Sequence, residues 1–232
     1  MSIHDGHRQR LKQRFLSEGL DGFSDVNVLE LLLFYCIPRR DTNPIAHALL
    51  ARFGSLSGVL EAPTSELNKV EGISDNAAVL LHLVTAVGRN YLVDKVSQDT
   101  VLNTIEKCGA YLVPRFLGRR NETVFLLCLD AKCKLKCCVE IGEGSVNAAG
   151  ISIRKVVETA LAANATSVVL AHNHPSGLAL PSGEDVQTTR RVAAALQTVD
   201  VELADHLVIS GDDYVSLAQS GFYQPGSRYT LA

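Results

Sequence analysis

The stretch LAHNHPSGLALPSGEDV contains two histidines separated by one residue, with an aspartate eleven positions after the second. In a β-strand successive side chains alternate between faces, so His172 and His174 project to the same side and Asn173 to the other. Pro175 ends the strand, and the loop after it can bring a helix alongside with Asp185 in its first turn. Two imidazoles, a carboxylate and a water are a ligand set typical of catalytic zinc. At such a site the bound water becomes a hydroxide nucleophile near neutral pH.

The same residues also have a purely structural interpretation. Ser182 and Asp185 form the Ser-x-x-Asp pattern of a capping box, which begins a helix. A cap explains both residues without a metal, although it leaves the paired histidines unexplained. Because a carboxylate has two oxygens, Asp185 can serve a cap and a metal together. Both interpretations therefore stay open.

The second half of the chain alternates between strand-forming and helix-forming segments. Apolar, β-branched runs predict strands, and amphipathic segments predict helices. The predicted strands are residues 122–130, 134–141, 166–174, 201–210 and 214–218, and the predicted helices are 151–164, 182–199 and one that ends within 108–118. This alternation predicts an α/β domain with the histidines at the mouth of its sheet.

The first half carries helical patterns and no strand-rich stretch. Asp25 is a candidate cap for an apolar helix. Pro44 is expected at the first position of another helix, which ends at Gly54. Ser74 is a candidate cap for a long helix that follows it. We therefore expect an all-α module in the first 95 residues or so, ahead of the α/β domain.

Composition excludes several classes of protein. At 232 residues, with 47% hydrophobic and 20% charged residues, the chain can build a sizeable core and is not typical of a disordered protein. A net charge of −3 without a basic tail does not indicate a general nucleic-acid-binding surface. The apolar runs are too short for a membrane span, and the N-terminus lacks the apolar core of a signal peptide. We therefore expect a cytoplasmic protein with no membrane partner.

The six cysteines do not indicate a second metal site. Cys133, Cys137 and Cys138 lie close together, but no second pair stands at zinc-finger spacing. The remaining three lie in apolar segments, where a free cysteine acts as a small hydrophobe. We expect reduced thiols that bind no metal, in keeping with a cytosolic compartment.

The spacing around the histidines resembles a known metalloprotease signature. The JAMM (MPN-plus) pattern is matched position for position by His172, His174, Ser182 and Asp185. The sequences AHNHPSG, PSGED and ADHLVIS resemble the RadC family of DNA-repair proteins within that superfamily. The helical first half resembles the N-terminal domain of this family through DVNVLELLLFYCIPRRDTNPIAHALLARFGSL and LNKVEGIS.

The resemblance implies two domains. A helical, helix-hairpin-helix-like domain is expected over residues 1–97, and a JAMM/MPN-like α/β metal-binding domain over residues 100–225. Their boundary is expected within residues 93–100.

The resemblance also implies a zinc-dependent (Zn2+) hydrolase that acts on peptide or isopeptide bonds. Its implied ligands are His172, His174 and Asp185, and Ser182 would stabilise a tetrahedral oxyanion. Glu122, at the start of the strand ETVFLLCLD, matches the position of the general acid/base of this family. Such a residue is needed because the metal acidifies the water, whereas the departing amine must receive a proton.

Two other acids compete with Glu122 for this role. Glu140 and Glu143, in VEIGEGSVN, can also face the same cleft. The position of the glutamate before the strand in the family favours Glu122. Asp205 and His206 lie outside the ligand pattern, so we expect them to support the site rather than bind the metal.

The sequence argues against one competing function, a zinc deaminase, and leaves others open. A zinc deaminase requires a Cys-x-x-Cys pair after its histidine, and none is present. A metal-dependent nuclease, or a DNA-binding accessory protein, remains an alternative. The segment LNKVEGISDNAAVLLHLV resembles one helix-hairpin-helix, but acids slightly outnumber lysines and arginines over residues 1–98. We expect a protein or peptide substrate, and DNA contact only through local patches such as Arg8–Arg14 or Arg39–Arg40.

Overall fold

The computed structural model describes residues 3–95, 101–144, 151–175, 177–226 and 231 of the chain. The chain divides into two compact units, Met1–Gly88 and Arg89–Ala232, each with its own buried core. Residues 96–100, most of the predicted boundary segment, lie outside the described residues. No described helix is long and apolar enough to cross a membrane.

The regular structure described between residues 3 and 95 is entirely helical. The helices are α1 (Ile3–Glu18), α2 (Asp25–Leu33), α3 (Asn43–Phe53), α4 (Leu56–Glu61), α5 (Thr64–Leu67) and α6 (Asp75–Asp94). Leu29, Leu49 and Leu81 come from three of these helices and are completely buried in one cluster. Burial of such leucines stabilises the unit, because each removes a large apolar side chain from water.

Two helix starts in this unit differ from the sequence-based predictions. Ser24, and not Asp25, caps α2: its backbone is extended and its hydroxyl accepts the N–H of Asn27. Asp25 is already the first helical residue, and its carboxylate accepts the N–H of Leu56 at the start of α4. Pro44 stands one place later than predicted, because α3 begins one residue before it.

The second unit is built on a five-stranded mixed sheet within the described residues. Its strands are β1 (Glu122–Leu129), β2 (Leu135–Gly144), β3 (Ser167–Asn173), β4 (Glu202–Ser210) and β5 (Asp213–Ser216), in the order β2-β1-β3-β4-β5. The β3–β4 pair is parallel and the other three pairs are antiparallel. The strand order places β3 at the centre of the sheet.

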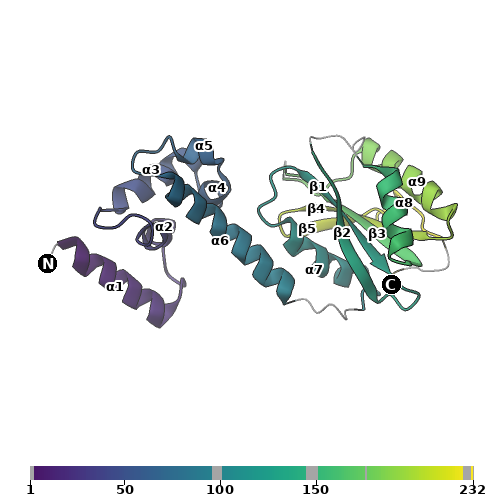
Figure 1. Cartoon of the computed structure of the whole chain (residues 1–232), viewed down its shortest axis with the longest axis horizontal. Coiled ribbons are helices and arrows are strands. Elements are labelled where there is room, and N and C mark those ends of the chain that lie inside the picture. The colour runs from purple at the N-terminus through teal and green to yellow at the C-terminus, as the bar shows by residue number, and fades with distance from the viewer. Residues whose placement is uncertain (1–2, 96–100, 145–150, 176, 227–230, 232) are drawn as a thin grey trace. The chain divides into compact units, whose positions relative to one another are not determined.

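Helices cover both faces of this sheet (Figure 1). One face packs on α7 (Ile105–Phe116), and the other packs on α8 (Ile153–Ala162) and α9 (Gly183–Gln197). Every residue of β3 is buried, as expected for a central strand covered on two sides. The unit is therefore an α/β domain, as the alternating sequence pattern predicted.

Candidate metal centre

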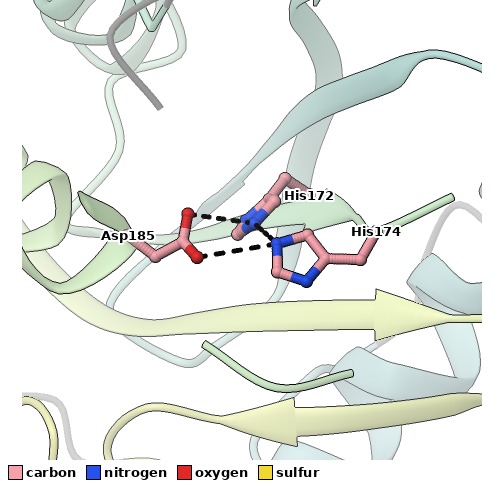
Figure 2. Close-up of side chains that lie close together, drawn as sticks. All are labelled: His172, His174 and Asp185. Atoms are coloured by element: carbon pink, nitrogen blue, oxygen red, sulfur yellow. Dashed lines mark hydrogen bonds and ion pairs between the residues drawn. The ribbon is translucent and has the colours of Figure 1, made fainter. Parts of the chain in front are cut away.

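The two histidines stand where the central strand β3 ends. His172 pairs with Val124 of β1 on one side and Val208 of β4 on the other. The backbone N–H of His174 still donates to the carbonyl of Ile209, which holds this residue against β4. The two Nε2 atoms lie 3.0 Å apart (Figure 2). The alternation of side chains along the strand thus brings both imidazoles to one side.

Asp185 reaches the histidines from the first turn of α9. Ser182 and Asp185 form the predicted capping box, in which the serine hydroxyl accepts the N–H of Asp185. The carboxylate Oδ2 accepts the backbone N–H of Ser182 at 2.7 Å and its hydroxyl at 2.6 Å. Oδ1 lies 3.2 Å from Nε2 of His172. The cap and the histidine contact coexist on the two oxygens, so neither interpretation excludes the other.

The donor atoms fit a divalent cation of the zinc type. Nε2 of His174 lies 3.5 Å from Oδ2 of Asp185, Nε2 of His172 lies 3.2 Å from Oδ1 of the same carboxylate, and the two Nε2 atoms are 3.0 Å apart. Tetrahedral zinc with nitrogen and oxygen ligands requires about 3.3 Å between ligand atoms. With one donor atom taken from each residue, all three lie within 4.8 Å of one another, and within the described residues they form the one group of His, Cys, Asp or Glu that could hold a metal ion.

The hydrogen bonds of His174 also suit a metal ligand. Its Nδ1 lies 3.1 Å from the carbonyl oxygen of Leu178, which can only accept, so Nδ1 carries the proton. Nε2 is then the nitrogen with a free lone pair, and it faces Asp185. Histidine ligands in proteins are commonly held in this way by a backbone carbonyl.

The electrostatic surroundings keep Asp185 ionised. Burial acts to raise the pKa of this carboxyl, but the neighbouring imidazole of His172 and the two hydrogen bonds from Ser182 outweigh it. The pKa of Asp185 is therefore held well below its usual range. The side chain of His174 is 16% exposed, against 5% for His172, so solvent approaches the group from the His174 side.

A second row of buried polar groups lies behind His172. Nε2 of His206, on β4, is 2.8 Å from Nδ1 of His172, and Nδ1 of His206 is 2.6 Å from the hydroxyl of Thr189 on α9. Burial, with His172 close by, lowers the pKa of His206 well below its usual range, so this imidazole is uncharged. His206 is not one of the three residues that could hold a metal. This agrees with the expectation that it supports the site rather than binds the metal.

Glu122 is the first residue of β1 and lies on the same face of the sheet as the histidines. Val124 is directly opposite His172, and side chains two apart along a strand share a face. Asn173 points to the other face, where its Oδ1 accepts the N–H of Thr123 at 2.7 Å. Its Nδ2 donates to the carbonyl of Asn121, so one amide holds both neighbours of Glu122.

The competing acids lie on the opposite face. Glu140 pairs with Phe125 and Glu143 pairs with Thr123, and both partners alternate with Glu122 and Val124 along β1. Arg119 lies 2.8 Å from a carboxylate oxygen of Glu140 and 3.9 Å from one of Glu143. Of the three glutamates considered, Glu122 alone shares the histidine face.

The three clustered cysteines are separated by the sheet. Cys137 packs against the core beneath α8 and α9, whereas Cys133 and Cys138 pack against the core beneath α7. Cys137 and Cys138 are adjacent on β2, so their side chains leave on opposite faces. All six cysteines are free thiols.

Three of the basic residues proposed for DNA contact, Arg8, Arg14 and Arg40, make bonds within the chain. Arg8 donates to the carbonyls of Phe34, Ile37 and Arg40, which ties α1 to the turn after α2. Arg14 pairs with Glu18 in the same helix, and Arg40 pairs with Glu71. DNA binding remains a prediction.

Sequence reasoning did not identify Asn173 and Thr189 as supports of the site, and it gave His206 no partner. Their contacts join residues 50, 17 and 34 positions apart, respectively. They depend on the register of three strands and on the docking of α9. Local spacing gives no signal for such contacts.

Comparisons with known proteins agree with this geometry. The family model described as "RadC-like JAB domain" matches residues 102–222, which include the whole sheet and the His-His-Asp group. A UPF0758 protein of Paraburkholderia xenovorans (strain LB400) is 35% identical to the chain over 211 residues. That alignment covers 91% of this chain and 83% of the relative, so the similarity extends into the helical unit.

Proposed function

Since this chain belongs to the RadC family, with a JAB-type domain, we propose that it is a zinc-dependent hydrolase acting on peptide or isopeptide bonds. The observation that carries the proposal is the arrangement of His172, His174 and Asp185. With one donor atom taken from each residue, the three atoms lie within 4.8 Å of one another, close enough to share one metal ion, on a side of the sheet that solvent reaches. A structural zinc would have four protein ligands, whereas three leave a position for the reaction.

Each ligand residue has its own support. Asp185 is held by the capping box of α9, His174 by the carbonyl of Leu178, and His172 by His206. A zinc ion held there would polarise the carbonyl of the substrate and lower the pKa of a water molecule. The supports fix the donor atoms in advance, which limits the reorganisation needed during the reaction.

We assign the proton transfer to Glu122. It lies on the histidine face, half-buried, at a strand end that Asn173 holds in place. Its carboxylate would accept a proton from water and deliver it to the departing amine. Ser182 can turn its hydroxyl from Asp185 toward an oxyanion, because its backbone N–H continues to hold the carboxylate.

An acyl bond suits this site better than a phosphodiester. Nucleases and phosphatases often use two metals about 3.5–4 Å apart, which requires a second set of ligands. The described residues supply a single group of three. The free thiols are consistent with the reducing cytoplasm in which we place the protein.

The test is metal content and zinc affinity of the purified chain, followed by hydrolysis of peptide, isopeptide and DNA substrate panels. Wild type should hold one zinc per chain, and Asp185→Ala should hold none. Glu122→Gln should keep zinc and lose hydrolysis, while the matched variant Glu143→Gln, on the opposite face, should keep both. A wild type without zinc affinity contradicts the proposal, and cleavage of DNA alone would favour the nuclease alternative.

A further inference from the structure

A buried chain of hydrogen bonds connects two of the proposed ligands behind the site. It runs from Nδ1 of His172 to His206 at 2.8 Å, and from His206 to the hydroxyl of Thr189 at 2.6 Å. The same hydroxyl is 2.6 Å from the main-chain carbonyl oxygen of Asp185. His206 and Thr189 are both completely buried, so water does not substitute for these partners.

The donor and the acceptor of every hydrogen bond in this series follow from the last acceptor, the carbonyl of Asp185. The carbonyl of Asp185 can only accept, so the single hydroxyl proton of Thr189 must point to it. The hydroxyl oxygen must then accept from His206, which places a proton on Nδ1 of His206. A second proton would place a charge on this completely buried ring, so Nε2 of His206 keeps its lone pair and accepts Nδ1–H of His172.

The opposite direction would be costly. If His206 carried its proton on Nε2, it would donate to His172, whose own proton would then sit on Nε2. That is the atom that faces Asp185 and His174, so it could no longer bind a cation. Nδ1 of His206 would also face Thr189 without a donor, leaving an unsatisfied pair of polar atoms in the interior.

We propose that His206 and Thr189 are positioning residues that hold the proton of His172 on Nδ1 and thereby keep its Nε2 available to the metal. This inference rests on the proposed function in one respect, namely that His172 is a ligand. Histidine ligands usually donate to a carboxylate, a carbonyl or water, and the first two of these can only accept. A histidine that accepts this hydrogen bond could instead donate it if its proton moved to the other ring nitrogen. The hydrogen bond from Nδ1 of His206 to Thr189 prevents that change.

Thr189 offers an isosteric test. Thr189→Val keeps the shape of the side chain and removes the hydroxyl, whereas Thr189→Ser keeps the hydroxyl. Ser167→Ala is the matched control, because Ser167 is a buried hydroxyl on β3 whose Oγ has no hydrogen-bond partner in the described structure. His206→Phe keeps an aromatic ring and removes the acceptor.

Two measurements on the full-length chain are needed. Nitrogen-15 NMR of the histidine rings, without metal and with zinc, reports which nitrogen of His206 and His172 carries the proton. Competition with a chromophoric chelator gives the zinc affinity. We expect Nδ1–H on both rings of wild type, and a zinc affinity about 10- to 100-fold weaker in Thr189→Val and in His206→Phe. Thr189→Ser and Ser167→Ala should bind as wild type does.

The outcomes separate this inference from the proposed function. If Thr189→Val and His206→Phe bind zinc as tightly as wild type, the positioning role is wrong and the metal site stands. A proton on Nε2 of His206 in wild type overturns it as well, even if the variants fail to fold. If wild type shows both Nδ1–H signals but binds no zinc, the proton arrangement stands and the hydrolase proposal fails.

Discussion

At the scale of single residues, one side-chain amide makes the hydrogen bonds that a neighbouring strand backbone would otherwise make. The amide of Asn173 completes the start of β1 by binding the N–H of Thr123 and the carbonyl of Asn121. It thereby fixes the residue between them, Glu122, relative to the histidines that flank Asn173 in sequence. The residue between the two proposed ligands therefore has a structural role of its own.

Asn173→Ala is expected to destabilise the protein by about 1–3 kcal/mol, because it leaves the buried N–H of Thr123 without an acceptor. Denaturant unfolding of the metal-free chain measures this loss. Asn121→Ala is the matched control, since the side chain of Asn121 is exposed and should contribute less than about 0.5 kcal/mol. Equal losses in the two variants would mean that the amide of Asn173 does not hold this strand end.

Substitutions of Ser182 distinguish its role as a helix cap from any role in metal binding. Ser182→Ala should cost about 1 kcal/mol in unfolding free energy through loss of the N-cap, while Ser182→Gly should cost only a few tenths. Both variants keep the backbone N–H that binds Asp185, so both should retain zinc in a chelator competition. Loss of zinc in either variant would show that the hydroxyl is required to position the carboxylate.

At the scale of elements, the proposed metal site belongs to one face of the sheet. The face beneath α8 and α9 carries the histidines beside one hydrophobic core, and the face beneath α7 carries a second core, which includes Leu112 and none of the proposed ligands. Substitutions in the core beneath α7 should therefore change stability without changing metal binding.

Leu112→Ala in α7 tests this separation. Leu112 is completely buried, so its truncation should cost about 2–5 kcal/mol in denaturant unfolding. Zinc affinity of the folded protein should remain unchanged, because α7 and the histidines are on opposite faces of the sheet. Leu161→Ala, at an exposed position in α8, should cost less than about 0.5 kcal/mol. A large drop in zinc affinity for Leu112→Ala would contradict the separation.

The elements were predictable to the extent that their signals are local. Strand and helix periods located β1 to β5 and the helices between them, and the capping pattern placed Asp185 in the first turn of α9. The start of α2 was misjudged, because Ser24 and Asp25 are both good caps and the backbone decides between them. A supporting role for His206 was predicted from the sequence, but its partner was not, because the partner depends on which residue of β4 stands beside β3.

At the scale of the whole molecule, the two units have separate cores. The clusters of the helical unit draw on residues between Leu11 and Leu81, and those of the α/β unit on residues between Leu102 and Leu231. The proposed ligands and Glu122 all belong to the second unit. Metal binding should therefore be a property of that unit alone.

A fragment of residues 89–232 should consequently fold and bind one zinc, with an affinity within about twofold of the full chain, since residues that share no partners contribute additively. Denaturant unfolding and chelator competition on the two proteins measure both properties. Asp185→Ala in the fragment is the control and should abolish binding there as in the full chain. A fragment that folds but binds zinc much more weakly would show that residues 1–88 contribute to the metal centre. Equal affinity would limit any role of the helical unit to steps other than metal binding, such as selection of the substrate.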